Sequence, residues 1–290
     1  MGDSAAASEE AIADGAPVPP AGSRAPLPGR ARRPLKSKHD PGVVRYVNGK
    51  LVEDSSPPVI QIISEFNNQD HGKVDVPAYP GDMVYMGINV QTEGGTPVRG
   101  ATVQVESPKG NAIVMMGDHT DKEGYLEFRM MASKPGKDRV KVSAAGVDND
   151  FFLDVTDPPR SEWLGGLNLK GVTSWDLLMS ANVKIGRDTI DATFPFALET
   201  LREKTVRLVG FMLPLGINEK QDHFLFSANP PSCYFHPPGG PTSAVEVFVN
   251  GNIEMDQDPM VIEGTLELVP HGEGGMVYKL RDAKLIAKAS

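Results

Sequence analysis

Apolar and polar residues alternate along most of the segment from Val59 to Thr156. The alternation is clearest at Val84–Val90, Thr102–Glu106, Tyr125–Arg129 and Val140–Val142. A period of two places one apolar strand face on a core and one polar face in solvent. Turn-forming pairs such as Pro80-Gly81 and Pro135-Gly136 separate these segments. About seven strands in about 100 residues predict a β-sandwich.

Three motifs in this segment strengthen that prediction. They are residues 95–103 (GTPVRGATV), residues 120–125 (TDKEGY) and residues 134–137 (KPGK), the last leading into Val140–Val142. The region from about residue 75 to 156 resembles the bacterial immunoglobulin-like domains of the intimin and invasin type. The resemblance implies an Ig-like sandwich over residues 58–156, used as a rigid spacer or adhesion module on an exported protein.

The C-terminal part predicts a second all-β unit over residues 163–290, after a proline-containing linker at 157–162. Its five strand candidates are Thr205–Leu213, His223–Ser227, Ala244–Val249, Val261–Val269 and Met276–Ala287, after a short helix at Ala197–Arg202. Gly210 and Gly264 are placed to relieve bending. We expect a small five-stranded barrel of the OB type, with a pleated sandwich as the alternative.

Residues 1–57 have a different composition, rich in Ala, Pro, Gly, Ser and charge. Such a segment buries too little apolar surface to offset the entropy of ordering it, which predicts a disordered leader. It is expected to act as a solvated tether, and the alternative is an electrostatic contact with anionic lipid or polymer. Near its end, Val43–Val47 followed by Asn48-Gly49 is typical of a short hairpin.

Charge and hydropathy narrow the classes of partner and compartment. The formal net charge is −9, which argues against nucleic acid as a partner. No run reaches the roughly 18–20 apolar residues of a membrane span. The N-terminus has no signal-peptide pattern, so either a leader has been removed from this chain or the protein is cytoplasmic. Because of the resemblance to exported domains, we expect the periplasm or the cell surface.

A distinctive loop lies in the C-terminal part, within residues 224–241 (FLFSANPPSCYFHPPGGP). Together with residues 209–215 (VGFMLPL) and 278–280 (YKL), it resembles a bacterial family of unknown function that carries a Cys-x-x-[His/Cys] loop rich in Pro and Gly. The resemblance covers about residues 175–287. It implies an exported or lipid-anchored protein, and it brings no established activity.

Cys233 and His236 are the candidate metal ligands, because a thiolate and an imidazole at this spacing suit zinc or copper. A closed zinc site needs more ligands, and His223, Asp222 and His271 would complete one only if the barrel brings them together. Two alternatives stay open for the pair: a structural thiol with a hydrogen-bonded histidine, and a nucleophilic Cys/His dyad. Asp118, His119 and Asp121 are expected to form a solvated turn.

Three functional hypotheses follow. The first is a non-catalytic, exported cell-envelope binding or structural protein, in which the Ig-like spacer presents the barrel to an envelope protein or polymer. The second is a zinc- or copper-handling protein that uses Cys233 and His236. The third is a cysteine-dependent enzyme. No catalytic residue and no organic cofactor is assigned, and the sequence does not predict the oligomeric state.

Overall fold

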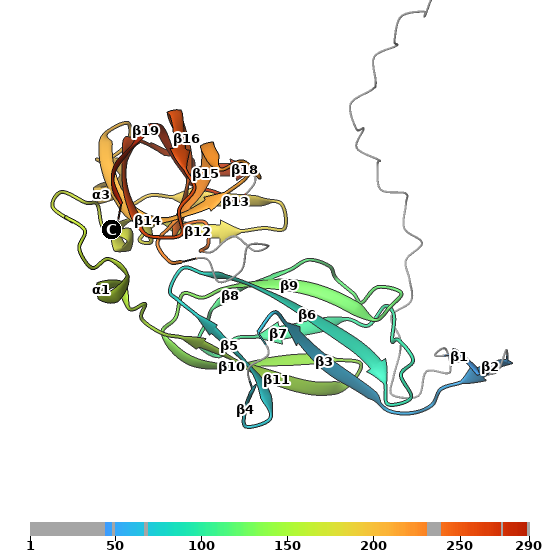
Figure 1. Ribbon diagram of the computed structural model, residues 1–290. Helices are drawn as coiled ribbons and strands as arrows, with labels where there is room; N and C mark the ends of the chain where they lie inside the picture. The colour runs from blue at the N-terminus through green and yellow to red at the C-terminus, as the bar shows by residue number, and fades with distance from the viewer. Residues whose placement is uncertain (1–43, 48–49, 67–68, 231–238, 274, 289–290) are drawn as a thin grey trace, which may run out of the picture. The chain divides into compact units, whose positions relative to one another are not determined.

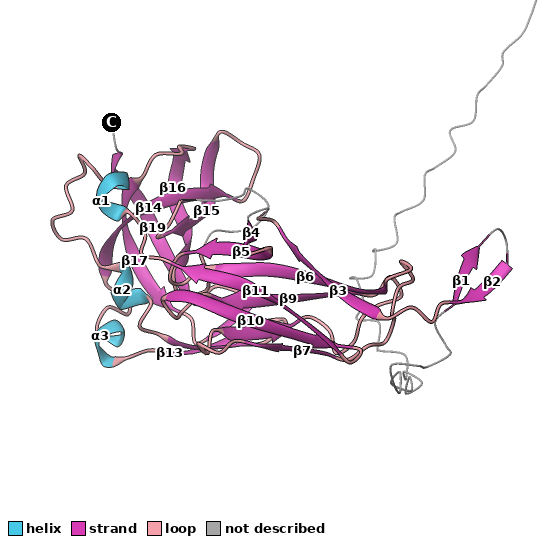
Figure 2. Cartoon of the chain, turned by 90° about the horizontal axis from the view of Figure 1, so that it is seen from below, coloured by secondary structure: helices cyan, strands magenta, loops and turns pink. Residues whose placement is uncertain are grey.

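The computed structural model describes residues 44–47, 50–66, 69–230, 239–273 and 275–288. These residues form mainly strands, with three one-turn helices shown in cyan in Figure 2. The all-β class expected from the sequence is therefore confirmed. There are two hydrophobic clusters, one drawn from Ile60–Val155 and the other from Trp175–Ala283. Most of the predicted leader, residues 1–43, lies outside the described residues.

Nine strands build the sandwich in the described part of the chain. They are β3 (Pro58–Ser64), β4 (Gln69–Asp70), β5 (Lys73–Ala78), β6 (Met83–Thr92), β7 (Val103–Glu106), β8 (Ala112–Met115), β9 (Tyr125–Met131), β10 (Gly136–Ala144) and β11 (Val147–Val155). One sheet has the order β3-β6-β9-β8, and the other has the order β4-β5-β11-β10-β7 (Figure 1). Neighbours are antiparallel except β5 and β11, which are parallel. This is the arrangement of an immunoglobulin-type sandwich.

The sandwich core follows directly from the alternation in the sequence. On β10, Val140 and Val142 are fully buried, whereas Lys141 between them is exposed. Phe128 from one sheet meets Phe151 from the other, with ring centroids 6.2 Å apart. Burial of each such large apolar side chain stabilises the fold by about 1.5–3 kcal/mol. The predicted pattern of inward and outward positions is thus realised in three dimensions.

Ordered contacts begin before the first sandwich strand. The expected hairpin pairs β1 (Val44–Val47) with β2 (Lys50–Glu53) in an antiparallel ladder. Directly after it, the Asp54 carboxylate accepts hydrogen bonds from the hydroxyls of Ser56, Thr92 and Thr96, each at 2.5 Å. These hydroxyl donors hold the pKa of Asp54 well below its usual range. Asp54 therefore ties the start of β3 to the turn that follows β6.

The C-terminal part forms a closed five-stranded barrel. Its strands are β14 (Thr205–Pro214), β15 (Lys220–Ser227), β16 (Ala244–Glu254), β17 (Met260–Leu268) and β19 (Tyr278–Lys288). The order around the barrel is β14-β15-β16-β19-β17, and only the contact between β16 and β19 is parallel. The predicted closed barrel is confirmed. At the bend of β17, a Cβ on Gly264 would lie only 2.8 Å from the Arg281 carbonyl oxygen, so glycine is needed there.

Smaller elements surround the barrel, and all but one of them were not predicted from the sequence. A three-stranded sheet joins β12 (Asn182–Ile185), β13 (Thr189–Thr193) and β18 (His271–Glu273). The helices are α1 (Arg160–Trp163), α2 (Trp175–Leu178) and α3 (Phe196–Glu199), the last close to the expected helix. The indole of Trp175 donates to the Val209 carbonyl at 2.6 Å, and the Tyr278 hydroxyl donates to the Leu178 carbonyl at 2.5 Å. These two bonds fasten α2 to the barrel.

Candidate functional site

The predicted Cys/His loop is the natural place to begin a search for a site. Cys233 and His236 lie within residues 231–238, outside the described residues, so their pairing stays a prediction. The described residues on either side of the loop, Asn229 and Gly239–Ser243, are largely buried. The contacts of these flanking residues show what surrounds the two ends of the loop.

Both ends of the loop contact the turn between β5 and β6 of the sandwich. The Ser243 hydroxyl donates to the Gly81 carbonyl at 2.8 Å and accepts from the backbone N–H of Gly240 at the same distance. The Asn229 side chain donates to the Asp82 carboxylate at 2.9 Å. We call this group of five residues the junction cluster. It joins the barrel to the sandwich through specific polar contacts.

The junction cluster needs glycine because the two backbones approach so closely. Gly81 has a φ of +91°, and a Cβ built on it would lie 2.7 Å from the Cβ of Ser243. A Cβ on Gly240 would lie 2.4 Å from the Gly81 carbonyl oxygen. Real Cβ atoms do not tolerate such contacts, so neither position accepts another residue without a shift of the backbone.

Aromatic packing accompanies these polar contacts. Trp163 on α1 meets Tyr79 at a centroid distance of 5.3 Å and Phe211 on β14 at 5.8 Å, both edge to face. Tyr79 precedes the junction turn and Phe211 belongs to the barrel. Edge-to-face pairs of this kind contribute about 0.5–1.5 kcal/mol beyond the area they bury. Trp163 thus bridges the sandwich and the barrel.

Asp82 is the titratable member of the junction cluster. Burial raises the pKa of the Asp82 carboxyl, while the hydrogen bonds from the Tyr79 backbone N–H and from the Asn229 amide oppose that rise. Among the described residues, the Asn229 Oδ1 and Thr242 Oγ1 atoms are buried without a hydrogen-bond partner. The foot of the loop is therefore a buried polar environment that disfavours added negative charge.

His223, the third candidate ligand, lies on β15 of the barrel. Its ring stacks on Phe248 with centroids 4.5 Å apart and planes 11° apart, and its Nε2 lies 2.9 Å from Glu246 Oε1. Lys279 approaches the same carboxylate at 3.6 Å. His223 is therefore held on the barrel surface by one aromatic neighbour and one carboxylate.

The other candidates have surroundings of their own. His271 is on β18, where its Nδ1 lies 2.8 Å from Asp191 Oδ1, and Asp222 is exposed. Asp121 accepts from the backbone N–H groups of Glu123 and Tyr125, as expected for a solvated turn. Throughout the described ranges, no group of three or more His, Cys, Asp or Glu side chains is placed to hold a metal ion.

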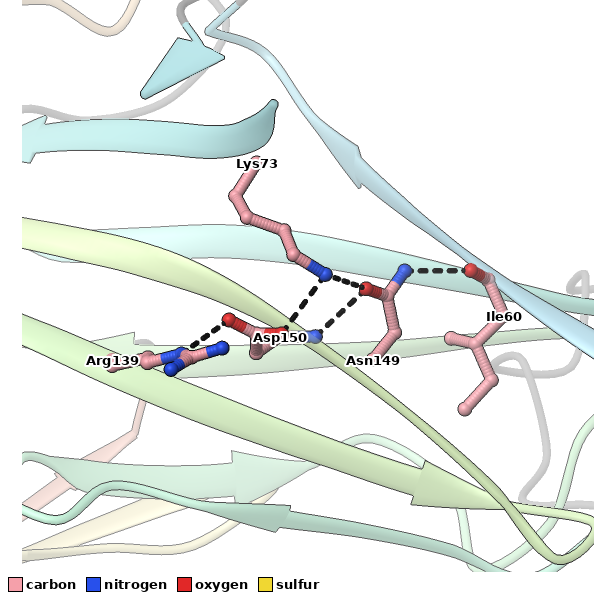
Figure 3. A network of polar contacts seen from close by, with 5 residues as sticks. All are labelled: Ile60, Lys73, Arg139, Asn149 and Asp150. Atoms are coloured by element: carbon pink, nitrogen blue, oxygen red, sulfur yellow. Dashed lines mark hydrogen bonds and ion pairs between the residues drawn. The ribbon is translucent and has the colours of Figure 1, made fainter. Parts of the chain in front are cut away.

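The outer face of the five-stranded sheet carries a network of paired charges (Figure 3). Asp150 contacts Lys73 Nζ at 2.9 Å and Arg139 Nε at 2.6 Å. The hydrogen bond from Arg139, followed by that from Lys73, lowers the pKa of Asp150. Asn149 accepts from Lys73 and donates to the Ile60 carbonyl of the other sheet at 2.8 Å. The network joins neighbouring strands and links the two sheets.

Sequence reasoning missed the junction cluster. Two segments contribute to it: Pro80-Gly81-Asp82 was predicted only as a turn between strands, and Gly239-Gly240-Pro241 only as part of the Pro- and Gly-rich Cys/His loop. The 2.8 Å contact between Ser243 and Gly81 depends on which loops the fold brings together across more than 150 residues of sequence. No local pattern encodes that distance.

The fold and this site define a two-module all-β protein: an Ig-like sandwich joined by buried contacts to a closed five-stranded barrel. In the described part of the chain, no helix has the length and apolar character needed to cross a membrane. Residues 189–285 match the family described as "Protein of unknown function (DUF3299)". This match agrees with the resemblance of the C-terminal half to an uncharacterised family. No curated protein matches the chain.

Several solved structures are similar to parts of the chain. A DUF3299 family protein from Pseudomonas aeruginosa PAO1 is 21% identical, with 34% of this chain and 70% of that chain covered and a TM-score of 0.27. Domains 4 and 5 of the S-layer protein SbsC are 10% identical, with 37% and 58% covered and a TM-score of 0.27. The adhesin InvE from Yersinia pseudotuberculosis is 8% identical, with 78% and 57% covered and a TM-score of 0.27. Scores this low support no functional argument.

Proposed function

We propose that this protein is a non-catalytic binding or structural module of the bacterial cell envelope, in which the sandwich acts as a spacer that presents the barrel to a partner. The junction cluster carries this proposal. Buried hydrogen bonds between Ser243 and Gly81, and between Asn229 and Asp82, hold the barrel on the end of the sandwich. A presenting module needs such a fixed connection.

The surface of the sandwich supports the spacer role. On its five-stranded sheet, four basic residues each contact a carboxylate of another strand: Lys73, Lys137, Arg139 and Lys141. Charges that are paired within the module stabilise the sheet, and they produce little net electrostatic potential that would attract a charged ligand.

The barrel is the proposed binding module, and we infer that it is of the OB type. The strands follow one another around the barrel in the order β14-β15-β16-β19-β17, which is the order first, second, third, fifth and fourth along the chain. The third and the fifth, β16 and β19, run parallel. Its overall charge, with 16 Asp and Glu against 11 Lys and Arg in residues 161–290, favours an envelope protein or polymer over nucleic acid.

Localisation tests this function directly. The full-length native gene product, carrying a C-terminal epitope tag, is expressed from its own locus, and cells are separated into cytosol, periplasm and envelope. We expect the protein in the periplasm or envelope, where it is labelled in intact cells by a membrane-impermeant biotin reagent after outer-membrane permeabilisation. Recovery in the cytosol alone, without labelling, would contradict the proposal.

A further inference from the structure

The seam between β16 and β19 is closed along only part of its length. The two strands pair from Glu246 with Lys279 to Val249 with Ala283. Beyond that point, the ladder partners of β16 are confined to β15, at residues 253–254, and the ladder partners of β19 are confined to β17, within residues 284–288. Each strand therefore keeps one edge whose backbone groups have no strand partner in the described part of the barrel.

Two kinks open the seam at this level. Gly251 on β16 has a φ of +113°, and Asp282 on β19 has a φ of +51°. The Asn250 amide donates to the Asp282 carboxylate at 2.8 Å, which fixes the point where the strands part. Because a positive φ breaks the regular pleat, the ladder shifts register around Asp282, ends one residue later at the pair of Val249 with Ala283, and does not reach Gly251.

A groove fills the space between the two open edges. Its volume is about 530 Å³, and its apolar lining consists of Val249, Ile253, Ala283 and Leu285. One residue of a strand in a packed sheet occupies about 160 Å³, from a rise of about 3.3 Å, a strand spacing of about 4.8 Å and a layer spacing of about 10 Å. The groove thus accommodates about three residues of an added strand.

The charged residues around the groove are mainly cationic. Lys220, Lys284 and Lys288 line it, against the single carboxylate of Glu254. Lys220 and Glu254 are 3.9 Å apart and both largely exposed, so their mutual attraction is weak. Lys284 and Lys288 also contact carboxylates outside the groove, at 2.8 and 2.9 Å. Lys220 is therefore the rim lysine with the weakest ion pair, and a ligand that brings its own carboxylate complements it.

We propose that the groove binds an extended, acidic segment of a partner polypeptide by strand addition to the free edges of β16 and β19. The backbone edges supply the hydrogen bonds, and pockets beside Val249 and Leu285 accept alternate small apolar side chains. A carboxylate of the segment lies near the lysines. The proposal deepens the function proposed above, on which it rests, because it names the kind of partner that the barrel binds.

The test uses the full chain, phage-displayed random octapeptides and two matched variants. Leu285→Asp places a carboxylate in the groove lining, and Ile286→Asp makes the same change on the adjacent residue, which does not line it. The two residues are comparably exposed, at 37% and 42%, so both variants are expected to fold. Binding of selected peptides is measured by fluorescence anisotropy, alongside analogues with alternate backbone amides methylated.

We expect selection of peptides that alternate small apolar residues with Asp or Glu. Leu285→Asp should weaken their binding at least tenfold, Ile286→Asp should leave it within twofold, and amide methylation should abolish it. Failure to enrich any peptide, equal effects of the two variants, or full binding of the methylated analogues would overturn the proposal. So would concentration-dependent dimerisation that is lost in Leu285→Asp, since a second copy would then be the occupant. None of these outcomes bears on localisation.

Discussion

Replacement of Gly81 by alanine is predicted to uncouple the barrel from the sandwich. At its φ of +91°, an alanine is strained by about 1–2 kcal/mol. Its Cβ would lie 2.7 Å from the Ser243 Cβ, and relief of such overpacking costs about 1–3 kcal/mol. Displacement of Ser243 also weakens its hydrogen bond to the Gly81 carbonyl, at about 0.5–1.5 kcal/mol. The expected destabilisation is about 3–6 kcal/mol.

Gly72 provides the matched control. It has a similar φ of +74°, but a Cβ there meets nothing within 4 Å. Gly72→Ala therefore carries the backbone strain alone, about 1–2 kcal/mol. The difference between the two variants in the free energy of unfolding therefore measures the contact at the junction cluster without the effect of an unfavourable φ.

The assay is urea unfolding with two probes. The chain has two tryptophans: Trp163 lies at the junction and Trp175 packs on the barrel, so fluorescence reports these regions and far-UV circular dichroism reports both modules. Native protein and Gly72→Ala should give coincident transitions. In Gly81→Ala the urea midpoint measured by fluorescence should decrease by about 1–2 M, and it should no longer coincide with the midpoint measured by circular dichroism. Equal, coincident shifts in both variants would refute the reasoning.

Three further predictions concern other parts of the chain. Asp54→Asn should lower stability by about 1–2 kcal/mol at pH 7, because it removes a charged acceptor of three hydroxyls. Since the pKa of Asp54 is lowered on folding, its contribution to stability is complete at neutral pH, begins to decrease below about pH 4, and is fully lost only below the lowered pKa of the folded state; a difference in urea midpoint between native protein and Asp54→Asn that does not shrink from pH 7 to pH 3 would argue against this. Tyr278→Phe should cost about 1–2 kcal/mol in thermal unfolding through loss of the bond to Leu178, and an unchanged melting temperature would show that bond to be unimportant. If Cys233 and His236 hold zinc or copper, elemental analysis of natively purified protein should find metal that a Cys233→Ser/His236→Ala double variant lacks, and equal metal content in both would end that hypothesis.

Local patterns predicted the strands well. The alternation around Val140 and Val142 specified which side chains enter the sandwich core. Such a feature depends on the pleat of one strand. Gly264 was expected only to relieve bending, whereas the structure places it close to the Arg281 carbonyl of another strand. The short sheet that includes β18 was missed because its strands of three to five residues contain too few positions to show a period.

The candidate site was harder to predict, because it depends on distant contacts. Ser243 and Gly81 are 162 residues apart in sequence, and neither residue type suggests the other as a partner. The residue type of His223 suggested a metal ligand, and its described neighbours are Phe248 and Glu246. Cys233 and His236 lie outside the described residues, so that hypothesis stays a prediction.

The central claim is that buried contacts fix the barrel on the sandwich. Residual dipolar couplings of backbone amides, measured separately for residues 58–155 and 205–288 in a weakly aligned sample, test it most directly. The account predicts that both sets fit one alignment tensor, with the same magnitude and the same principal axes. Two tensors of clearly different magnitude would show independent motion of the modules and would contradict the account.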